Sequence, residues 1–300
     1  MSQPLTKSST IPPKRSVSKS SFSLWLSWPL VPALVMFIVF FVIPLVMMLG
    51  ISFASRDTYG RIAWLWTLSN YERVFDPLYW TLYMRSAVLS VLTTGCCLVL
   101  GFPLAYAIAR APAHFQRVLL VLVMIPFWTS FLVRTYAWIF ILRTEGLFNT
   151  ILIKWGILTQ PLEILYTNSA VLLGLVYGYL PFMVLPLYVV IERISPVLEE
   201  AAYDLYAGKW MMFRRIILPL AKPGIIGGCL LVFVPSLGAF ITPYLLGGGK
   251  TMMLGTLIQH EFLVIRDWPF GSALSFILMA IVLVVLAGLV KRTSGIAPVA

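Results

Sequence analysis

The chain has 300 residues, of which 60% are hydrophobic and only 11% are charged, against about 25% in soluble domains. A surface with so few charges cannot face water over most of its area, so a soluble globular fold is excluded and a membrane protein is predicted. The net charge of +11 does not indicate a nucleic-acid-binding protein, because the basic residues separate hydrophobic blocks and do not gather on one face.

The N-terminal region combines a polar tail with a long apolar block. Residues 1–23 are rich in Ser and Pro and carry four basic residues without an acid, a composition that does not build a core. We therefore expect a flexible cytoplasmic tail there. The block 24–53 is longer than the apolar region of a cleavable signal peptide, so it is predicted to remain as the first transmembrane helix.

Five more apolar blocks have lengths near the ~20 residues that a helix needs to cross the hydrocarbon core. They cover residues 86–109, 118–142, 169–191, 223–242 and 271–290. The predicted fold is all-α and integral to the membrane, with six transmembrane helices, a transmembrane domain over 85–290 and a cytoplasmic tail over 291–300. Arg134 stands about 24 Å along the third block and is expected to extend its side chain to the outer interface.

The distribution of Lys and Arg predicts the orientation, because cytoplasmic loops carry the excess of basic residues. With the N-terminus inside, the inner segments hold 13 of the 22 basic residues and four of the 11 acidic ones. The inner side then carries +9 and the outer side +2. We therefore expect a multi-pass protein with both termini in the cytoplasm.

Residues that carry chemistry are sparse in this sequence. The three cysteines lie inside apolar blocks, and His114 and His260 fall on opposite sides of the predicted membrane, so no metal site is expected. The run Gly247-Gly-Gly-Lys-Thr251 lacks the upstream glycine of a phosphate-binding loop and lies on the outer side, away from ATP. We expect neither enzymatic activity nor a cofactor in this chain.

The longest inner loop, residues 192–222, has a helical pattern of its own. Ser195 can cap a helix that begins with Pro196 at the first helical position. Glu199 and Glu200 follow in the first turns, where the helix dipole favours acidic residues. The loop is longer than a plain connection requires, and a short cytoplasmic helix is predicted at its start.

The predicted helix has a face suited to a partner. Glu200 and Asp204 stand at i and i+4, so their carboxylates lie on one face. Ala201 and Ala202 keep one side of the helix narrow enough for close approach. A turn near Gly208 and a second helix then lead to the next span, so the pattern predicts a helix–turn–helix that can dock into a groove.

The stretch from Glu200 to Ile225, EAAYDLYAGKWMMFRRIILPLAKPGI, resembles the EAA coupling motif of ABC importer permeases. The resemblance implies that residues 196–222 form a coupling segment, which sits in a cleft of the cytoplasmic ATPase and transmits its closure to the membrane helices. It also implies a set of ATPase-coupling residues: Glu200, Ala201, Ala202, Asp204 and Gly208.

One position departs from the family pattern, because Tyr206 stands where the family usually has Gly. A left-handed turn is about 1 to 2 kcal/mol less favourable for Tyr than for Gly. Two interpretations follow. Either the turn shifts to Gly208, or Tyr206 directs its ring to the partner.

The resemblance extends over residues 70–279 and is most specific to the spermidine/putrescine importer permeases. It is carried by four segments: 76–79 (DPLY), 126–136 (PFWTSFLVRTY), 180–186 (LPFMVLP) and 265–271 (IRDWPFG). It implies the type I importer fold in a bacterial inner membrane. It also implies a second permease subunit, an ATPase subunit dimer that uses the ATP, an extracytoplasmic substrate-binding protein and membrane lipid as partners, and no nucleic acid.

A polyamine needs carboxylates for ion pairing and aromatic faces for cation–π contact. The candidates for a substrate pathway are aromatic residues of the spans and acids of the outer side: Trp138, Tyr177, Tyr179, Glu145 and Asp267. Each is also explained as a solvated loop acid or an interfacial aromatic residue, so the substrate rests on the resemblance. The alternatives are an importer of an opine, an amino-acid derivative or an aminophosphonate, and a secondary transporter, which would need internal symmetry or a ring of intramembrane charges.

Overall fold

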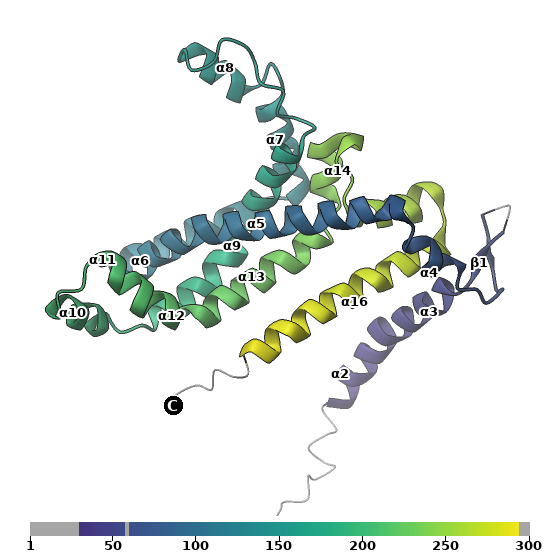
Figure 1. Ribbon diagram of the computed structural model, residues 1–300, viewed down its shortest axis with the longest axis horizontal. Helices are drawn as coiled ribbons and strands as arrows, with labels where there is room; N and C mark the ends of the chain where they lie inside the picture. Colours follow the sequence, from purple (N-terminus) through teal and green to yellow (C-terminus); the bar gives the residue numbers. More distant parts are fainter. Residues whose placement is uncertain (1–29, 58–59, 294–300) are drawn as a thin grey trace, which may run out of the picture. The chain divides into compact units, whose positions relative to one another are not determined.

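A computed structural model describes residues 30–57 and 60–293 (Figure 1). The predicted N-terminal tail over 1–23 and the last residues of the C-terminal tail lie outside the described residues. Nearly all regular structure is helical, which confirms the predicted all-α class. The described residues also contain one short hairpin that the sequence did not predict, in which β1 (Ser55–Arg56) pairs antiparallel with β2 (Ile62–Ala63), Ser55 opposite Ala63.

The chain divides into two compact units, residues 1–48 and 49–300. The described helix at the N-terminal end comprises α2 (Leu30–Phe37), the π-helical η1 (Ile38–Val42) and α3 (Ile43–Ser52). The 22 residues of Val31–Ser52 are long and apolar enough to cross a membrane, as the sequence predicted for the first span.

The second unit contains the remaining helices. In chain order they are α4 (Ser69–Val74), α5 (Pro77–Ala109), α6 (Ala113–Trp128), α7 (Phe131–Leu142), α8 (Leu147–Lys154), α9 (Asn168–Glu192), α10 (Pro196–Asp204), α11 (Lys209–Met212), the π-helical η2 (Phe213–Ile217), α12 (Leu218–Leu220), α13 (Lys222–Leu237), α14 (Ile241–Gly247), the 3-10 helix η3 (Gly248–Lys250), α15 (Leu254–His260), the π-helical η4 (Glu261–Ile265) and α16 (Trp268–Thr293).

Two of the predicted spans are broken. The block 118–142 does not form one helix, because α6 ends at Trp128 and the chain turns by 89° before α7. At the break, the Thr129 hydroxyl donates to the Pro126 carbonyl at 2.8 Å, a local bond that competes with helix continuation. The block 223–242 is also interrupted, because α13 ends at Leu237, before Gly238.

The described helices give four candidate spans, or six if each of two bent pairs is one span. The pairs are Ala113–Trp128 with Phe131–Lys154, and Lys209–Leu220 with Lys222–Leu237.

The break also changes the surroundings of Arg134. Its guanidinium carbon lies 5.1 Å from the centre of the Phe127 ring and 5.6 Å from that of Phe131. Its Nε and Nη1 atoms are buried and have no hydrogen-bond partner in the described part of the chain. The side chain therefore lies over the end of α6, and its expected extension toward the interface stays a prediction.

The main core of the second unit lies where α5, α9 and α13 pack side by side (Figure 1). Met183 of α9 is fully buried between two glycines. A Cβ atom added to Gly101 of α5 would lie 3.0 Å from its Cγ, and one added to Gly228 of α13 would lie 2.7 Å from its Sδ. Small residues at these crossings allow the close helix approach that membrane bundles require.

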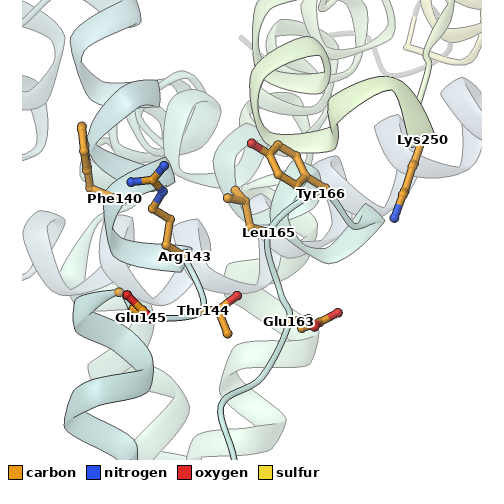
Figure 2. A pocket seen from close by; sticks show the side chains of 9 residues that line it. Phe140, Arg143, Thr144, Glu145, Glu163, Leu165, Tyr166 and Lys250 are labelled. Carbon is orange, nitrogen blue, oxygen red and sulfur yellow. The ribbon is translucent and has the colours of Figure 1, made fainter.

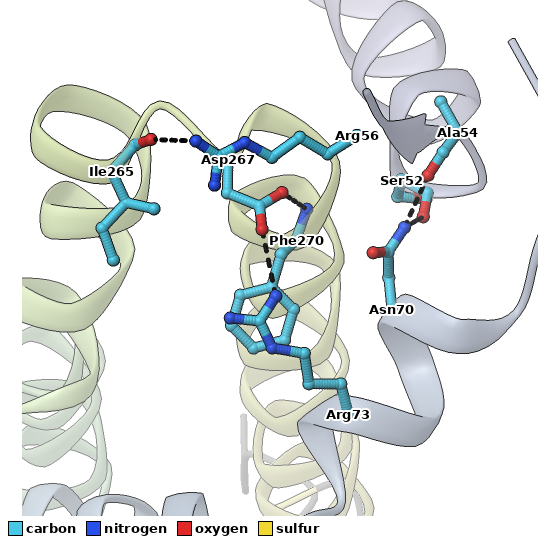
Figure 3. Close-up of polar contacts among 8 residues, drawn as sticks. All are labelled: Ser52, Ala54, Arg56, Asn70, Arg73, Ile265, Asp267 and Phe270. Atoms are coloured by element: carbon cyan, nitrogen blue, oxygen red, sulfur yellow. Dashed lines mark hydrogen bonds and ion pairs between the residues drawn. The ribbon is translucent and has the colours of Figure 1, made fainter. Parts of the chain in front are cut away.

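Polar contacts hold α4 against the start of α16 (Figure 3). Arg73 pairs with Asp267 at 3.0 Å, and its guanidinium carbon lies 3.9 Å from the centre of the Phe270 ring. The Asn70 amide donates to the carbonyls of Ser52 and Ala54 at 2.9 and 2.7 Å. These bonds satisfy buried polar groups and fix this end of the second unit.

Candidate functional site

Helix α10 begins as the sequence predicted, with Pro196 at its first position and Ser195 at the N-cap. The Ser195 hydroxyl, however, makes no capping bond; the Ser195 carbonyl instead accepts the Leu198 N–H at 3.1 Å. After the turn, α11, η2 and α12 follow without interruption over Lys209–Leu220 and meet α13 at a bend of 67°. The predicted helix–turn–helix is therefore present.

The structure places Glu200 and Asp204 in the same helix, α10, as predicted for the acidic face. Glu200, Ala201 and Asp204 are exposed, and neither carboxylate has a hydrogen bond or ion pair within the described chain. Ala202 was predicted beside them, but it is only 5% exposed. The Ala202 side chain is therefore buried within this chain, and its part in ATPase coupling stays a prediction. Gly208 is exposed at the N-cap of α11.

The turn occurs at Tyr206, with φ +57°, and does not shift to Gly208, where φ is −67°. The Tyr206 N–H donates to the Tyr203 carbonyl and the Ala207 N–H to the Ala202 carbonyl, both at 2.9 Å. These two bonds form a Schellman motif, with Tyr in the place that Gly usually occupies. The ring is 98% exposed, so no contact of this chain offsets the strain.

Replacing Tyr206 with Gly is expected to raise stability by about 1 kcal/mol, because Gly enters the left-handed region without a Cβ penalty. Thermal unfolding of the purified protein in detergent measures the change. Gly208→Ala is the matched control, since a Cβ at Gly208 meets nothing within 4 Å and its φ is negative. A Tyr206→Gly variant less stable than the parent would contradict the strained turn.

Around this turn, large apolar side chains remain exposed. Leu205 is 81% exposed and Trp210 is 72% exposed, and further exposed apolar residues stand close in sequence: Val197, Leu198, Tyr203 and Met211. Clustered apolar exposure of this kind marks an interaction surface. We call Glu200, Asp204, Leu205 and Tyr206 the α10 face, which combines two free carboxylates with uncovered apolar groups.

A second contact of α10 was missed by sequence analysis. Glu199 accepts hydrogen bonds from Arg110, with Nε at 2.7 Å and Nη2 closer still, and from the Tyr106 hydroxyl at 2.9 Å. Both charged side chains are less than a fifth exposed. Both Arg110 nitrogens bond the same oxygen, Oε1, and Tyr106 bonds Oε2. Because Arg110 caps the end of α5, this charge-assisted contact ties α10 to a core helix.

The predicted aromatic pathway residues are only partly brought together. Trp138 of α7 and Tyr177 of α9 meet edge to face with ring centres 5.5 Å apart. Tyr179 points elsewhere, since its hydroxyl donates to the Pro235 carbonyl of α13 at 3.2 Å. The pair Trp138–Tyr177 thus offers an aromatic surface, and Tyr179 links two core helices.

Glu145 lies in a different place, an open pocket of about 750 Å³ between the start of α8 and the loop before α9 (Figure 2). Its lining includes a second carboxylate, Glu163, two cations, Arg143 and Lys250, and the Tyr166 ring. The pocket is lined by neither Trp138 nor Tyr177. The sequence-predicted pathway residues therefore divide between a pocket of mixed charge, which holds Glu145, and an aromatic pair.

Asp267 does not belong to either group. It is 4% exposed, and both carboxylate oxygens are engaged (Figure 3). Oδ2 pairs with Arg73, while Oδ1 accepts the Phe270 N–H at 3.2 Å, as a helix-capping Asp does. Its charge is thus paired within this chain and its oxygens face the start of α16, and its place on a substrate pathway stays a prediction.

A further acid, Glu261, lies buried close to Asp267. Glu261 of η4 is 3% exposed, and its Oε2 has no hydrogen-bond partner among the described residues. Burial raises the pKa of this carboxyl above its ordinary value of 4.5, although the nearby Arg73 acts in the opposite direction. The folded chain therefore holds a proton on Glu261 more tightly than the unfolded chain does.

This pKa shift predicts the behaviour of Glu261→Gln. Ionised Glu261 destabilises the fold above its raised pKa, and the penalty disappears as the pH falls toward 4.5. The Gln variant should therefore be more stable than the parent at pH 8 and equally stable at acidic pH, as thermal unfolding at several pH values would show. An advantage that grew on acidification would contradict the sign of the shift.

Comparisons with known proteins give a consistent result. The family described as "Binding-protein-dependent transport system inner membrane component" matches residues 97–293. The spermidine/putrescine transport system permease protein PotB of Escherichia coli (strain K12) is 45% identical over 241 residues, which cover 80% of this chain and 88% of that protein. The protein of the same name from Haemophilus influenzae is 45% identical over 252 residues, with coverage of 83% and 88%.

A solved structure supports the fold independently. A chain of the bacterial alginate ABC transporter, in complex with alginate pentasaccharide-bound periplasmic protein, superposes with a TM-score of 0.72. The match covers 91% of this chain and 96% of that chain at 19% sequence identity. At this identity the likeness concerns the fold alone, and it agrees with the predicted permease architecture.

Proposed function

This chain belongs to the family of binding-protein-dependent transport system inner membrane components, and we propose that as an ABC importer permease it moves spermidine, putrescine or a similar small cationic amine into the cell. The choice of substrate rests on the 45% identity, over four fifths of the chain, to permeases named for spermidine and putrescine. The chain works as a transport subunit of the inner membrane.

The ATP is hydrolysed by a separate ATPase subunit dimer, which docks on the α10 face. Two exposed carboxylates, Glu200 and Asp204, stand beside the uncovered rings and side chains of the turn, a combination suited to a partly basic groove. A second permease subunit completes the pathway, and an extracytoplasmic binding protein delivers the substrate. The excess of basic residues in the inner segments supports the orientation with both termini in the cytoplasm.

Movement of α10 reaches the core helices by two routes. The ion pair of Glu199 with Arg110 connects α10 to the end of α5. The segment Lys209–Leu220 connects it to α13 through the 67° bend. Because α5 and α13 both pack on α9, closure of the ATPase dimer displaces the helices that form the core of the second unit.

On the outer side, Glu145 and Glu163 supply two carboxylates for an arriving polycation, and Tyr166 supplies an aromatic face. Arg143 and Lys250 line the same pocket and limit its attraction for cations, so the pocket is suited to brief capture before transfer. Trp138 and Tyr177 offer the next aromatic surface. Tyr179 links α9, the helix that carries Tyr177, to α13.

Uptake of radiolabelled spermidine and putrescine into proteoliposomes that contain the complete importer tests the substrate. We expect ATP-dependent uptake of at least one polyamine, with little competition from opines, amino-acid derivatives or aminophosphonates. Failure of both polyamines, with strong competition by one of the other compounds against binding-protein-delivered substrate, would overturn the polyamine assignment. Uptake that is independent of ATP would instead favour a secondary transporter.

A further inference from the structure

An apolar groove lies between α5, the segment Lys209–Leu220 and α13. We propose that an anionic phospholipid of the inner leaflet binds there, with an acyl chain in the groove and its phosphate on Arg214 and Arg215. The proposal goes beyond transport of polyamines and rests on the proposed orientation of the chain.

The groove has a volume of about 600 Å³, within the ~300–1,000 Å³ range of ligand sites. Its lining is almost entirely apolar and includes Val99, Phe102 and Tyr106 of α5, Trp210 and Phe213 of the connecting segment, and Ile225 of α13. Tyr106 contributes its ring, since its hydroxyl is bound to Glu199. The occupant must therefore be a hydrocarbon group.

The π-helical turn η2 shapes one wall of this groove. Its closing bond runs from the Leu218 N–H to the Phe213 carbonyl, five residues apart. This wider turn brings Phe213 and Leu218 onto the same side, where both line the groove. Phe213 also packs edge to face on Phe102 with ring centres 5.3 Å apart, and Trp210 stacks on Phe213 at 5.6 Å.

The segment that forms one wall of the groove also carries exposed basic residues. Arg214 and Arg215 follow Phe213 in the chain, are exposed, and make no ion pair or hydrogen bond within the described residues. The stretch 209–222 also carries Lys209 and Lys222, and it contains no acid. An exposed Trp with unpaired basic residues is typical of a segment at the membrane interface, and such charges attract anionic headgroups.

These observations favour a lipid over a helix of the second permease. An apolar helix would fill the groove but would leave both arginines without a counter-charge. A phospholipid can satisfy both features, because one molecule carries a hydrocarbon chain for the groove and a phosphate for the arginines of the same segment. Its chain would also support Tyr106, and through it the contact of α5 with Glu199.

Photolabelling of the intact importer in proteoliposomes tests the site. Two probes are compared, phosphatidylglycerol and phosphatidylcholine with the same photoactivatable acyl chain. We expect phosphatidylglycerol to label peptides that contain residues 98–106 and 210–225, and Arg214→Gln with Arg215→Gln to lower this labelling about tenfold, since each basic residue contributes to anionic-lipid attraction. Arg117→Gln with Arg193→Gln removes the same number of exposed charges elsewhere and should change little.

Two results would overturn the proposal. One is equal labelling by the two lipids, which would mean that the arginines do not select the headgroup. The other is absence of lipid labelling together with a crosslink from a Val99→Cys variant to the second permease, which would assign the groove to that subunit. Labelling does not depend on transport, so a wrong substrate assignment would leave this result intact.

Discussion

Glu200→Ala is expected to abolish ATP-driven uptake while the chain still enters the membrane and assembles. The Glu200 side chain is exposed and has no hydrogen bond or ion pair within the described chain, so its removal does not weaken the fold. Loss of a carboxylate that is paired in a partner's groove costs about 2 to 5 kcal/mol, which corresponds to a fall of roughly 30-fold to several thousand-fold in productive docking.

The measurement compares ATP-dependent uptake with the amount of assembled complex in the membrane. Glu192→Ala is the matched control, because Glu192 is an exposed acid at the end of α9, outside the α10 face, and contacts Gln116 at 3.3 Å and Tyr188 of its own helix. The control should transport normally. Normal uptake by Glu200→Ala would contradict a role of Glu200 in coupling.

Arg110→Glu is expected to uncouple ATP hydrolysis from transport, so that ATP is still hydrolysed but less substrate is imported. The change places two carboxylates together at the joint between α10 and α5, where the pair of Arg110 with Glu199 is less than a fifth exposed. Breaking a buried pair of this kind costs about 3 to 5 kcal/mol. The α10 face stays intact, so the ATPase still docks, but its movement no longer reaches α5.

The number of substrate molecules imported per ATP hydrolysed is the quantity to measure. It should fall sharply in Arg110→Glu and in Glu199→Arg, and it should recover in the double variant that exchanges the two charges. Such a cycle isolates the interaction from the separate effects of each substitution. Single variants with an unchanged ratio, or a double variant as defective as either single one, would contradict the role of the pair.

The parts of the site that the sequence predicted are set by local rules. Proline at the first position and acids in the first turns fix where α10 begins, and i, i+4 spacing puts Glu200 and Asp204 on one face. The turn was left open between two interpretations, because the left-handed preference of Gly208 competes with the position of Tyr206. In the structure the two Schellman hydrogen bonds form around Tyr206, so the turn lies there, although the left-handed conformation is strained for Tyr.

The parts that could not be predicted depend on contacts between distant residues. Glu199 and Arg110 are 89 positions apart, and Asp267 and Arg73 are 194 apart. Their pairing follows from helix packing, which composition and periodicity do not encode. For the same reason, Asp267 resembled a free outer acid in the sequence, and the 89° break after Trp128 was hidden inside a uniformly apolar block.

A photocrosslinking amino acid at position 206 tests most directly whether the α10 face is where the ATPase docks. The Tyr206 ring is 98% exposed, so the substitution disturbs no contact of this chain. In the assembled importer we expect a crosslink to the ATPase subunit whose yield changes with nucleotide, and none from the matched position 147 on α8, which is 64% exposed. Absence of an ATPase crosslink at position 206, or an equal one at position 147, would contradict the coupling role of α10.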